Sequence, residues 1–220
     1  AMYHAKAKGR GNFQFFTEDM NVATTERMSI EADLRLALAH GEFLLHYQPQ
    51  LDLRSGTIVG VEALIRWQHP TRGLVSPVDF IPIAEESGMI AAIGDWVLEE
   101  ACRQLRAWQL KGIADLRMSI NLSSGQFLDK TLPIRIHELL ASNNLSAHLL
   151  DLEVTESMSM ASPDESISVM KTLRSSGLTL SIDDFGTGYS SLAYLKLLPI
   201  NTLKIDRSFV KDIESDPNDA

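Results

Sequence analysis

Strands and helices alternate regularly along the second half of the chain, and this alternation is the feature that most limits the fold. Short apolar runs typical of strands occupy residues 116–122, 149–155, 178–184 and 202–206. Helical patterns separate them at residues 131–142, 163–176 and 190–197. A helix between two strands implies a right-handed crossover and parallel pairing. The pattern therefore predicts a parallel sheet covered by helices, either a barrel or an open doubly wound sheet.

Two strands come earlier, and the link between them is too short for a crossover. Residues 43–53 and 57–67 have strand patterns, with a turn at Ser55-Gly56 between them. Such a turn requires antiparallel pairing. Helix start and stop signals predict a helix at 24–40, with Thr24 and Thr25 as candidate caps and Gly41 at its C-terminal end. Further helices are predicted from Ser76-Pro77 to Gly88 and at 92–111. A capping box, Ser162-x-x-Glu165, is predicted to open the helix at 163–176.

The composition excludes several classes of protein. Of 220 residues, 45% are hydrophobic and 22% are charged, which is typical of a globular chain rather than a disordered one. The net charge of -9 argues against binding to DNA or RNA polymers. No apolar stretch approaches the ~20 residues that span a bilayer, so we expect no membrane insertion of this segment. A single cysteine, Cys102, suits a reducing cytoplasm, and any membrane tether would come from upstream domains.

Five strands carry polar side chains on one face and apolar side chains on the other. Side chains alternate along a strand, so Asp151, Glu153 and Thr155 share one face and oppose Leu152 and Val154. The other polar faces contain Glu62 and Arg66, Ser119 and Asn121, Ser181 and Asp183, and Thr202, Lys204 and Asp206. If the apolar faces pack against helices, the polar faces point toward a common axis. Charges buried there need one another or a cation.

The polar residues near the strand ends favour a metal site. Glu62, Glu153, Asp183 and Asp184 are carboxylates, and Asn121 adds an amide oxygen. Oxygen ligands suit Mg²⁺, Mn²⁺ or Ca²⁺. Four carboxylates make two ions plausible, an arrangement that recurs in phosphoester hydrolysis. The six histidines form no ligand-spaced pair, which disfavours zinc.

The same residues carry a resemblance to a known family. Glu62-Ala63-Leu64 (within VEALIRW), Asn121-Leu122-Ser123, EVTE at 153–156, DDFGTG at 183–188 and LKID at 203–206 occur in the order typical of EAL domains. Over residues ~25–220 the chain resembles this family. Residues 1–16 resemble the end of a GGDEF domain, the diguanylate cyclase module. We therefore expect a GGDEF remnant at 1–20, a linker helix or start of the EAL domain at 21–42, and an EAL domain at 43–220.

The resemblance implies a TIM-type (β/α)₈ barrel with an antiparallel first strand. It also implies metal-dependent hydrolysis of cyclic di-GMP to linear pGpG with two Mg²⁺ or Mn²⁺ ions. The family's later motifs, an AEGVE-like and a QGY-like strand, do not occur in this chain. We therefore expect about six of the eight strands and weak or no activity from this chain alone.

The resemblance assigns a role to each matching residue. The implied metal ligands are Glu62, Asn121, Glu153, Asp183 and Asp184. The implied catalytic residues are Lys204, which holds the nucleophilic water, together with Glu62 and Asp184. The implied substrate-binding residues are Gln48, Leu64, Arg66 and Asp206. Glu156, Gly186, Thr187 and Gly188 are expected to couple a loop to homodimerisation.

Each residue also has an ordinary structural explanation when taken alone. Glu62 and Arg66 could form an ion pair, Asp183-Asp184 could form a turn, and Lys204 could lie on the surface. Two other functions stay open: a non-catalytic cyclic di-GMP receptor, and an interaction module that does not use the site. The coincidence of the motifs on five strands favours the phosphodiesterase.

Overall fold

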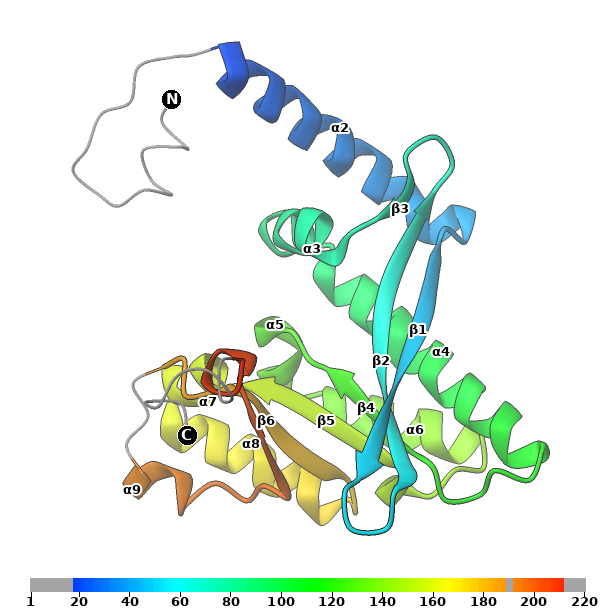
Figure 1. The fold of residues 1–220 in the computed structure, drawn as a ribbon, viewed down its shortest axis with the longest axis vertical. Helices are drawn as coiled ribbons and strands as arrows, with labels where there is room; N and C mark the ends of the chain where they lie inside the picture. Colours follow the sequence, from blue (N-terminus) through cyan, green and yellow to red (C-terminus); the bar gives the residue numbers. More distant parts are fainter. Residues whose placement is uncertain (1–17, 189–191, 212–220) are drawn as a thin grey trace. The chain divides into compact units, whose positions relative to one another are not determined.

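The computed structural model describes residues 18–188 and 192–211 (Figure 1). The predicted GGDEF remnant at 1–20 lies almost entirely outside the described residues. The chain divides into two compact units. The first comprises residues 1–44 and 66–90, and the second comprises residues 45–65 and 91–220.

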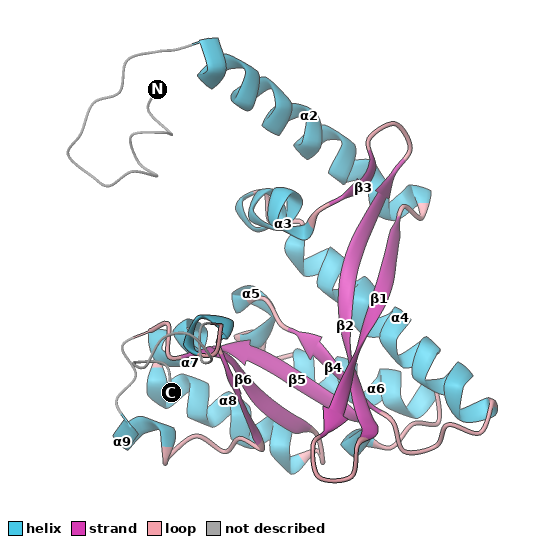
Figure 2. Cartoon of the chain, in the orientation of Figure 1, coloured by secondary structure: helices cyan, strands magenta, loops and turns pink. Residues whose placement is uncertain are grey.

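One sheet contains all six predicted strands, with boundaries shifted by up to two residues (Figure 2). Its strands are β1 (Phe43–Asp52), β2 (Thr57–His69), β4 (Arg117–Asn121), β5 (Leu150–Thr155), β6 (Thr179–Phe185) and β7 (Thr202–Ile205), hydrogen-bonded in that order. The strands from β2 to β7 pair in parallel along this path. A short strand that the sequence did not reveal, β3 (Gly73–Val75), pairs antiparallel with β2.

The turn between β1 and β2 is built by Asp52. Its Oδ1 accepts hydrogen bonds from the backbone N–H groups of Arg54 and Ser55 at 2.9 and 2.8 Å. Gly56 has a φ of +69°, and its N–H donates to the Asp52 carbonyl at 2.8 Å. Four linking residues can only reverse the chain, so β1 and β2 form the antiparallel pair that the sequence predicted.

Helices connect the parallel strands of the second unit. These are α4 (Ile90–Leu110), α5 (Ser124–Phe127), α6 (Leu132–Ser142), η1 (Ala147–Leu149), α7 (Glu156–Ala161), α8 (Pro163–Ser175) and α9 (Leu192–Leu195), and the short helix η2 (Arg207–Phe209) follows the last strand. The apolar strand faces are fully buried, as at Ile120, Leu152 and Leu180. In α8, which contacts β6, Met170 and Leu173 are also buried. The core of this unit is therefore the apolar strand faces together with the helices.

The first unit has its own aromatic core. It contains α2 (Glu18–His40) and α3 (Pro77–Glu86), which contact each other. The rings of Phe43, Trp67 and Phe80 lie with centroids 5.6–6.0 Å apart. The Trp67 indole N–H donates to Glu42 Oε2 at 2.9 Å, which satisfies the polar atom of a fully buried ring.

Two predicted caps are wrong. The helix predicted from residue 24 begins at Glu18, so Thr24 and Thr25 lie inside it. Ser162 makes no capping hydrogen bond, because α7 ends there and leaves Ser162 at φ −145° and ψ 80°. Pro163, whose ring fixes a helical φ, opens α8 instead. A capping box does form at Ser123 in α5, a helix the sequence did not reveal.

Candidate metal centre

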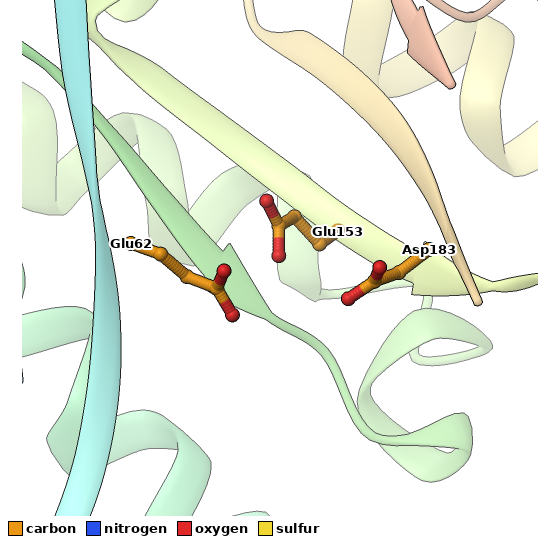
Figure 3. Close-up of side chains that lie close together, drawn as sticks. All are labelled: Glu62, Glu153 and Asp183. Carbon is orange, nitrogen blue, oxygen red and sulfur yellow. The ribbon is translucent and has the colours of Figure 1, made fainter. Parts of the chain in front are cut away.

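Three carboxylates converge on one side of the sheet. Glu62 comes from β2, Glu153 from β5 and Asp183 from β6, and one oxygen of each lies within 4.8 Å of the others (Figure 3). The Glu153 side chain is fully buried, whereas those of Glu62 and Asp183 are 16% and 22% exposed. Like charges this close repel strongly, so the cluster requires a cation or protons.

Strand register places these residues on successive strands in steps rather than in one row: Glu62 of β2 pairs with Ser119 of β4, two residues before Asn121. Asn121 of β4 pairs with Glu153 of β5, and Thr155 of β5 pairs with Asp183 of β6. Asn121 Nδ2 donates to Glu62 Oε1 at 2.8 Å, which joins β4 to the cluster. Three predicted carboxylate ligands and the predicted amide ligand are therefore brought together.

Lys204 of β7 supplies positive charge to all three carboxylates. Its Nζ lies 3.1 Å from Glu62 Oε2, 2.6 Å from Glu153 Oε2 and 2.9 Å from Asp183 Oδ2. Burial acts to lower the pKa of Lys204, but the hydrogen bonds to Glu153 and Asp183 outweigh it, and the pKa is raised. Lys204 is therefore a charged ammonium inside the cluster, and the surface-lysine interpretation is wrong.

The contact between Lys204 and Glu62 requires a strongly curved sheet. Strand β7 stands four places from β2 in the strand order. At about 4.8 Å per strand, a flat sheet would separate the two strands by roughly 19 Å. The 3.1 Å contact between their side chains instead requires the sheet to curl around the polar faces, as in a barrel. Between the two architectures open from the sequence, the structure has the barrel, in incomplete form.

The buried carboxylate holds its proton unusually tightly. Burial raises the pKa of Glu153 to about 7, the Lys204 hydrogen bond opposes this rise, and the charges of Glu62 and Asp183 add to it. Among the described residues, Glu153 Oε1 is buried with no hydrogen-bond partner. A carboxylate oxygen in this state is suited to bind a cation, which supplies both charge and a partner. The donor set therefore fits a divalent metal with oxygen ligands.

Asp184 stands next to the cluster rather than in it. It is exposed, and its φ of +53° is unusual for a residue other than glycine. Burial of part of the carboxyl group raises its pKa, and the charges of Asp183 and Asp206 raise it further. A strained backbone beside a charged cluster is common at functional sites. Asp184 is therefore not among the three carboxylates that converge, and its role as a metal ligand stays a prediction.

The loop after β6 is attached to a buried glutamate. Glu156 Oε2 accepts hydrogen bonds from the backbone N–H groups of Gly186 at 2.6 Å and Gly188 at 3.4 Å. A Cβ atom at Gly188 would lie 2.8 Å from Glu156 Oε1, so a larger residue there would displace the Glu156 carboxylate. Thr187 Oγ1 donates to the Asp184 carbonyl at 2.8 Å. These hydrogen bonds attach residues 186–188 to Glu156, and the coupling of the loop to a homodimer stays a prediction.

The predicted substrate-binding residues occupy different surroundings. Gln48 is exposed on β1, and Leu64 is partly buried two residues after Glu62 on β2. Arg66 belongs to the first unit. Asp206 caps η2 by accepting from the Ser208 N–H at 2.8 Å and from its hydroxyl, and these bonds lower the pKa of Asp206. Their contact with a substrate stays a prediction.

Sequence reasoning missed two features near the centre. Helix α7 begins at Glu156, and its start is capped by Thr155, whose Oγ1 accepts from the Met158 N–H at 3.3 Å. The threonine before Glu156 is a signal that could have revealed it. Asp151 was placed on the polar face but given no role, although it is buried beneath Glu153 on the same strand.

Comparison with known families gives one assignment for most of the chain. Residues 31–220 match the family described as EAL domain. Within the described residues, no helix combines the length and apolarity needed to cross a membrane.

Individual relatives extend this result. The chain is 47% identical over 220 residues to the bifunctional diguanylate cyclase/cyclic di-GMP phosphodiesterase MucR of Pseudomonas aeruginosa, covering 100% of this chain and 32% of that protein. It is 45% identical over 219 residues to the cyclic di-GMP phosphodiesterase NbdA of the same organism, covering 100% of this chain and 28% of that protein. The structure of the PaMucR phosphodiesterase in complex with c-di-GMP matches with a TM-score of 0.83 at 46% identity, covering 87% of this chain and 77% of that one. The chain thus spans a third or less of these curated relatives.

Proposed function

Since the chain belongs to the EAL domain family, we propose that it takes part in hydrolysing cyclic di-GMP to linear pGpG. The observation that carries this proposal is the convergence of Glu62, Glu153 and Asp183 around the Lys204 ammonium. The names of MucR and NbdA, and the c-di-GMP complex of PaMucR, support the choice of substrate.

Two Mg²⁺ or Mn²⁺ ions are the proposed cofactors. Glu62, Asn121, Glu153 and Asp183 would hold the first ion, and Asp184 would contribute to the second. When bound, such ions lower the pKa of a coordinated water and neutralise the charge of a phosphodiester. The unpartnered oxygen of Glu153 and the all-oxygen donor set support this assignment.

In the proposed reaction, Lys204 donates a hydrogen bond to the attacking water and keeps its own proton, since its pKa is raised. The water oxygen forms a bond to phosphorus as the bond to the 3′ oxygen breaks. The water loses one proton, and the leaving oxygen gains one. The Lys204 ammonium lies where negative charge develops on the phosphoryl group, and fixed positive charge there stabilises the transition state.

Residues around the cluster would orient the nucleotide. Arg66 would bind a phosphate, for which its planar guanidinium is suited, and Gln48, Leu64 and Asp206 would line the groove. The loop that Glu156 anchors, with Gly186, Thr187 and Gly188, would couple metal binding to a homodimer contact. We further propose that an upstream GGDEF domain accompanies this segment in the whole protein and that both work in the cytoplasm.

The test is hydrolysis of cyclic di-GMP in the presence of Mn²⁺, followed by product chromatography, by this chain and by a chain extended through the AEGVE-like and QGY-like strands, in which we expect the higher turnover. We expect pGpG, and we expect Glu62→Ala to abolish its formation while the matched control Glu165→Ala, an exposed position on α8, retains it. The Lys204→Ala variant should lose kcat more than substrate affinity. Binding of cyclic di-GMP without turnover would replace this proposal with the non-catalytic receptor.

A further inference from the structure

A buried glutamine stands just after the strand that carries Asn121. Gln126 is the third residue of α5 and is 3% exposed. Its Oε1 accepts hydrogen bonds from the backbone N–H of Ser123 at 3.3 Å and from the Ser123 hydroxyl at 3.1 Å. The Gln126 N–H donates to Ser123 Oγ at 3.3 Å, which completes the capping box at the start of α5.

This capping box fixes the chain at the point where the hydrogen bonds of the sheet end. Asn121 is the last residue of β4, and the Leu122 N–H donates to the Glu153 carbonyl of β5 at 2.9 Å. The next N–H along the chain is that of Ser123, and the Gln126 side chain accepts it. The turn that follows Asn121 is therefore held by Gln126 rather than by a neighbouring strand.

A glycine on α4 leaves room for the Gln126 amide. A Cβ atom at Gly94 would overlap all three atoms of this amide group, Oε1, Cδ and Nε2, so the amide lies directly against the Gly94 Cα. An amide at the end of a free side chain could move aside, but Gln126 is buried and bonded to Ser123. A methyl group at position 94 would therefore move the amide away from Ser123 or move α5 away from α4.

The polar end of the Gln126 side chain is costly to bury. Among the described residues, Gln126 Nε2 is a buried atom with no hydrogen-bond partner. An unpaired buried N–H opposes folding, and a leucine would fill a similar volume without that cost. A leucine could not accept hydrogen bonds from the N–H and the hydroxyl of Ser123. These two hydrogen bonds are therefore what the glutamine contributes at this position.

We propose that Gln126 is a positioning residue for Asn121. Its amide, held against Gly94 of α4, fixes the turn at Ser123 and with it the end of β4. At that end, Asn121 Nδ2 donates to Glu62 Oε1 at 2.8 Å, which places the Asn121 amide beside the carboxylate cluster. This inference rests on the metal-dependent function proposed above, in which Asn121 is a ligand of the first ion.

The test measures Mn²⁺ binding by electron paramagnetic resonance, independently of hydrolysis. Gln126→Leu keeps a side chain of similar volume and removes the acceptor for Ser123, and we expect it to raise the Kd for Mn²⁺ three- to tenfold. In a chain that already carries Asn121→Ala, the same substitution should change the Kd less than twofold, because the residue through which Gln126 acts is gone. A merely structural role would weaken Mn²⁺ binding equally with and without Asn121.

A second variant keeps the proposal testable if Gln126→Leu does not fold. Gly94→Ala should displace the Gln126 amide and raise the Kd for Mn²⁺ three- to tenfold, again only when Asn121 is present. The matched control is Gly125→Ala on α5, where a Cβ atom would meet open space, and it should bind Mn²⁺ as the unmodified chain does. Unchanged Mn²⁺ affinity in a folded Gln126→Leu or Gly94→Ala variant, an equal rise in Kd with and without Asn121, or no Mn²⁺ binding by the unmodified chain would overturn the inference.

The two proposals fail separately. Hydrolysis of cyclic di-GMP by a chain whose Gln126→Leu variant binds Mn²⁺ normally would overturn the role of Gln126 and leave the proposed function standing. A Kd for Mn²⁺ that rises only when Asn121 is present, in a chain that forms no pGpG even when extended through the AEGVE-like and QGY-like strands, would support the role of Gln126 and overturn the phosphodiesterase.

Discussion

Replacing Lys204 by methionine tests how far the ammonium stabilises the metal-free carboxylate cluster. Each of its contacts with Glu62, Glu153 and Asp183, at 2.6–3.1 Å, corresponds to about 5–6 kcal/mol of gross attraction at an effective dielectric constant of about 20. Desolvation of the ammonium offsets much of this, and removing one partner of a buried ion pair costs about 3–5 kcal/mol in measured cases. The Lys204 side chain is 25% exposed, so we expect the lower part of that range.

Proton uptake by Glu153 limits the loss of stability in the Lys204→Met variant. The pKa of Glu153 is already raised to about 7, so without Lys204 this carboxyl takes up a proton near neutral pH and removes one of the three charges. We therefore expect Lys204→Met to lower the free energy of unfolding by about 2–4 kcal/mol at pH 8. In a chain of this size, that corresponds to a Tm lower by roughly 5–15 °C.

The assay is thermal unfolding followed by circular dichroism in the presence of a chelator. At pH 5, where Glu153 is protonated in both proteins, the difference in Tm should shrink. The matched control is Lys171→Met, an exposed lysine on α8, and its Tm should stay within about 2 °C of the unmodified chain. A Lys204→Met variant as stable as this control at pH 8 would refute the reasoning.

Three further predictions concern the centre, its loop and the first unit. Because Glu153 must lose its proton to bind a cation, the affinity for Mn²⁺ should fall by up to about tenfold per pH unit below pH 7. Titration calorimetry would measure this, and an Mn²⁺ affinity that stays constant from pH 5.5 to 8 would contradict it. Gly186→Ala places a Cβ atom against the Phe209 ring at a residue whose φ is +102°. We expect it to lower the free energy of unfolding by about 1–3 kcal/mol in urea. An unchanged free energy of unfolding would mean that the loop adapts freely. Phe80→Ala empties a fully buried position and should cost about 3–5 kcal/mol by the same assay, and a cost below 1 kcal/mol would contradict this packing.

Much of the fold could be predicted because its signals are local. The six strands and the helix at 132–142 follow from short patterns of apolar residues. Each of these elements begins and ends within two residues of its predicted bounds. The predicted cap at Ser162 was wrong because two local signals compete for this residue. Ser162 and Glu165 have the spacing of a capping box, but Ser162 also ends α7, and one residue could not adopt both conformations.

The sequence by itself determined which side chains share a face, because alternation along a strand is a property of the backbone. This was enough to place Glu62, Asn121, Glu153, Asp183 and Lys204 on one polar surface. It left open whether Lys204 and Glu62, 142 residues apart, would ever meet. Only the tertiary structure decided this, because the curvature that brings β7 back toward β2 arises from the twist summed over every strand between them and from the helices packed outside.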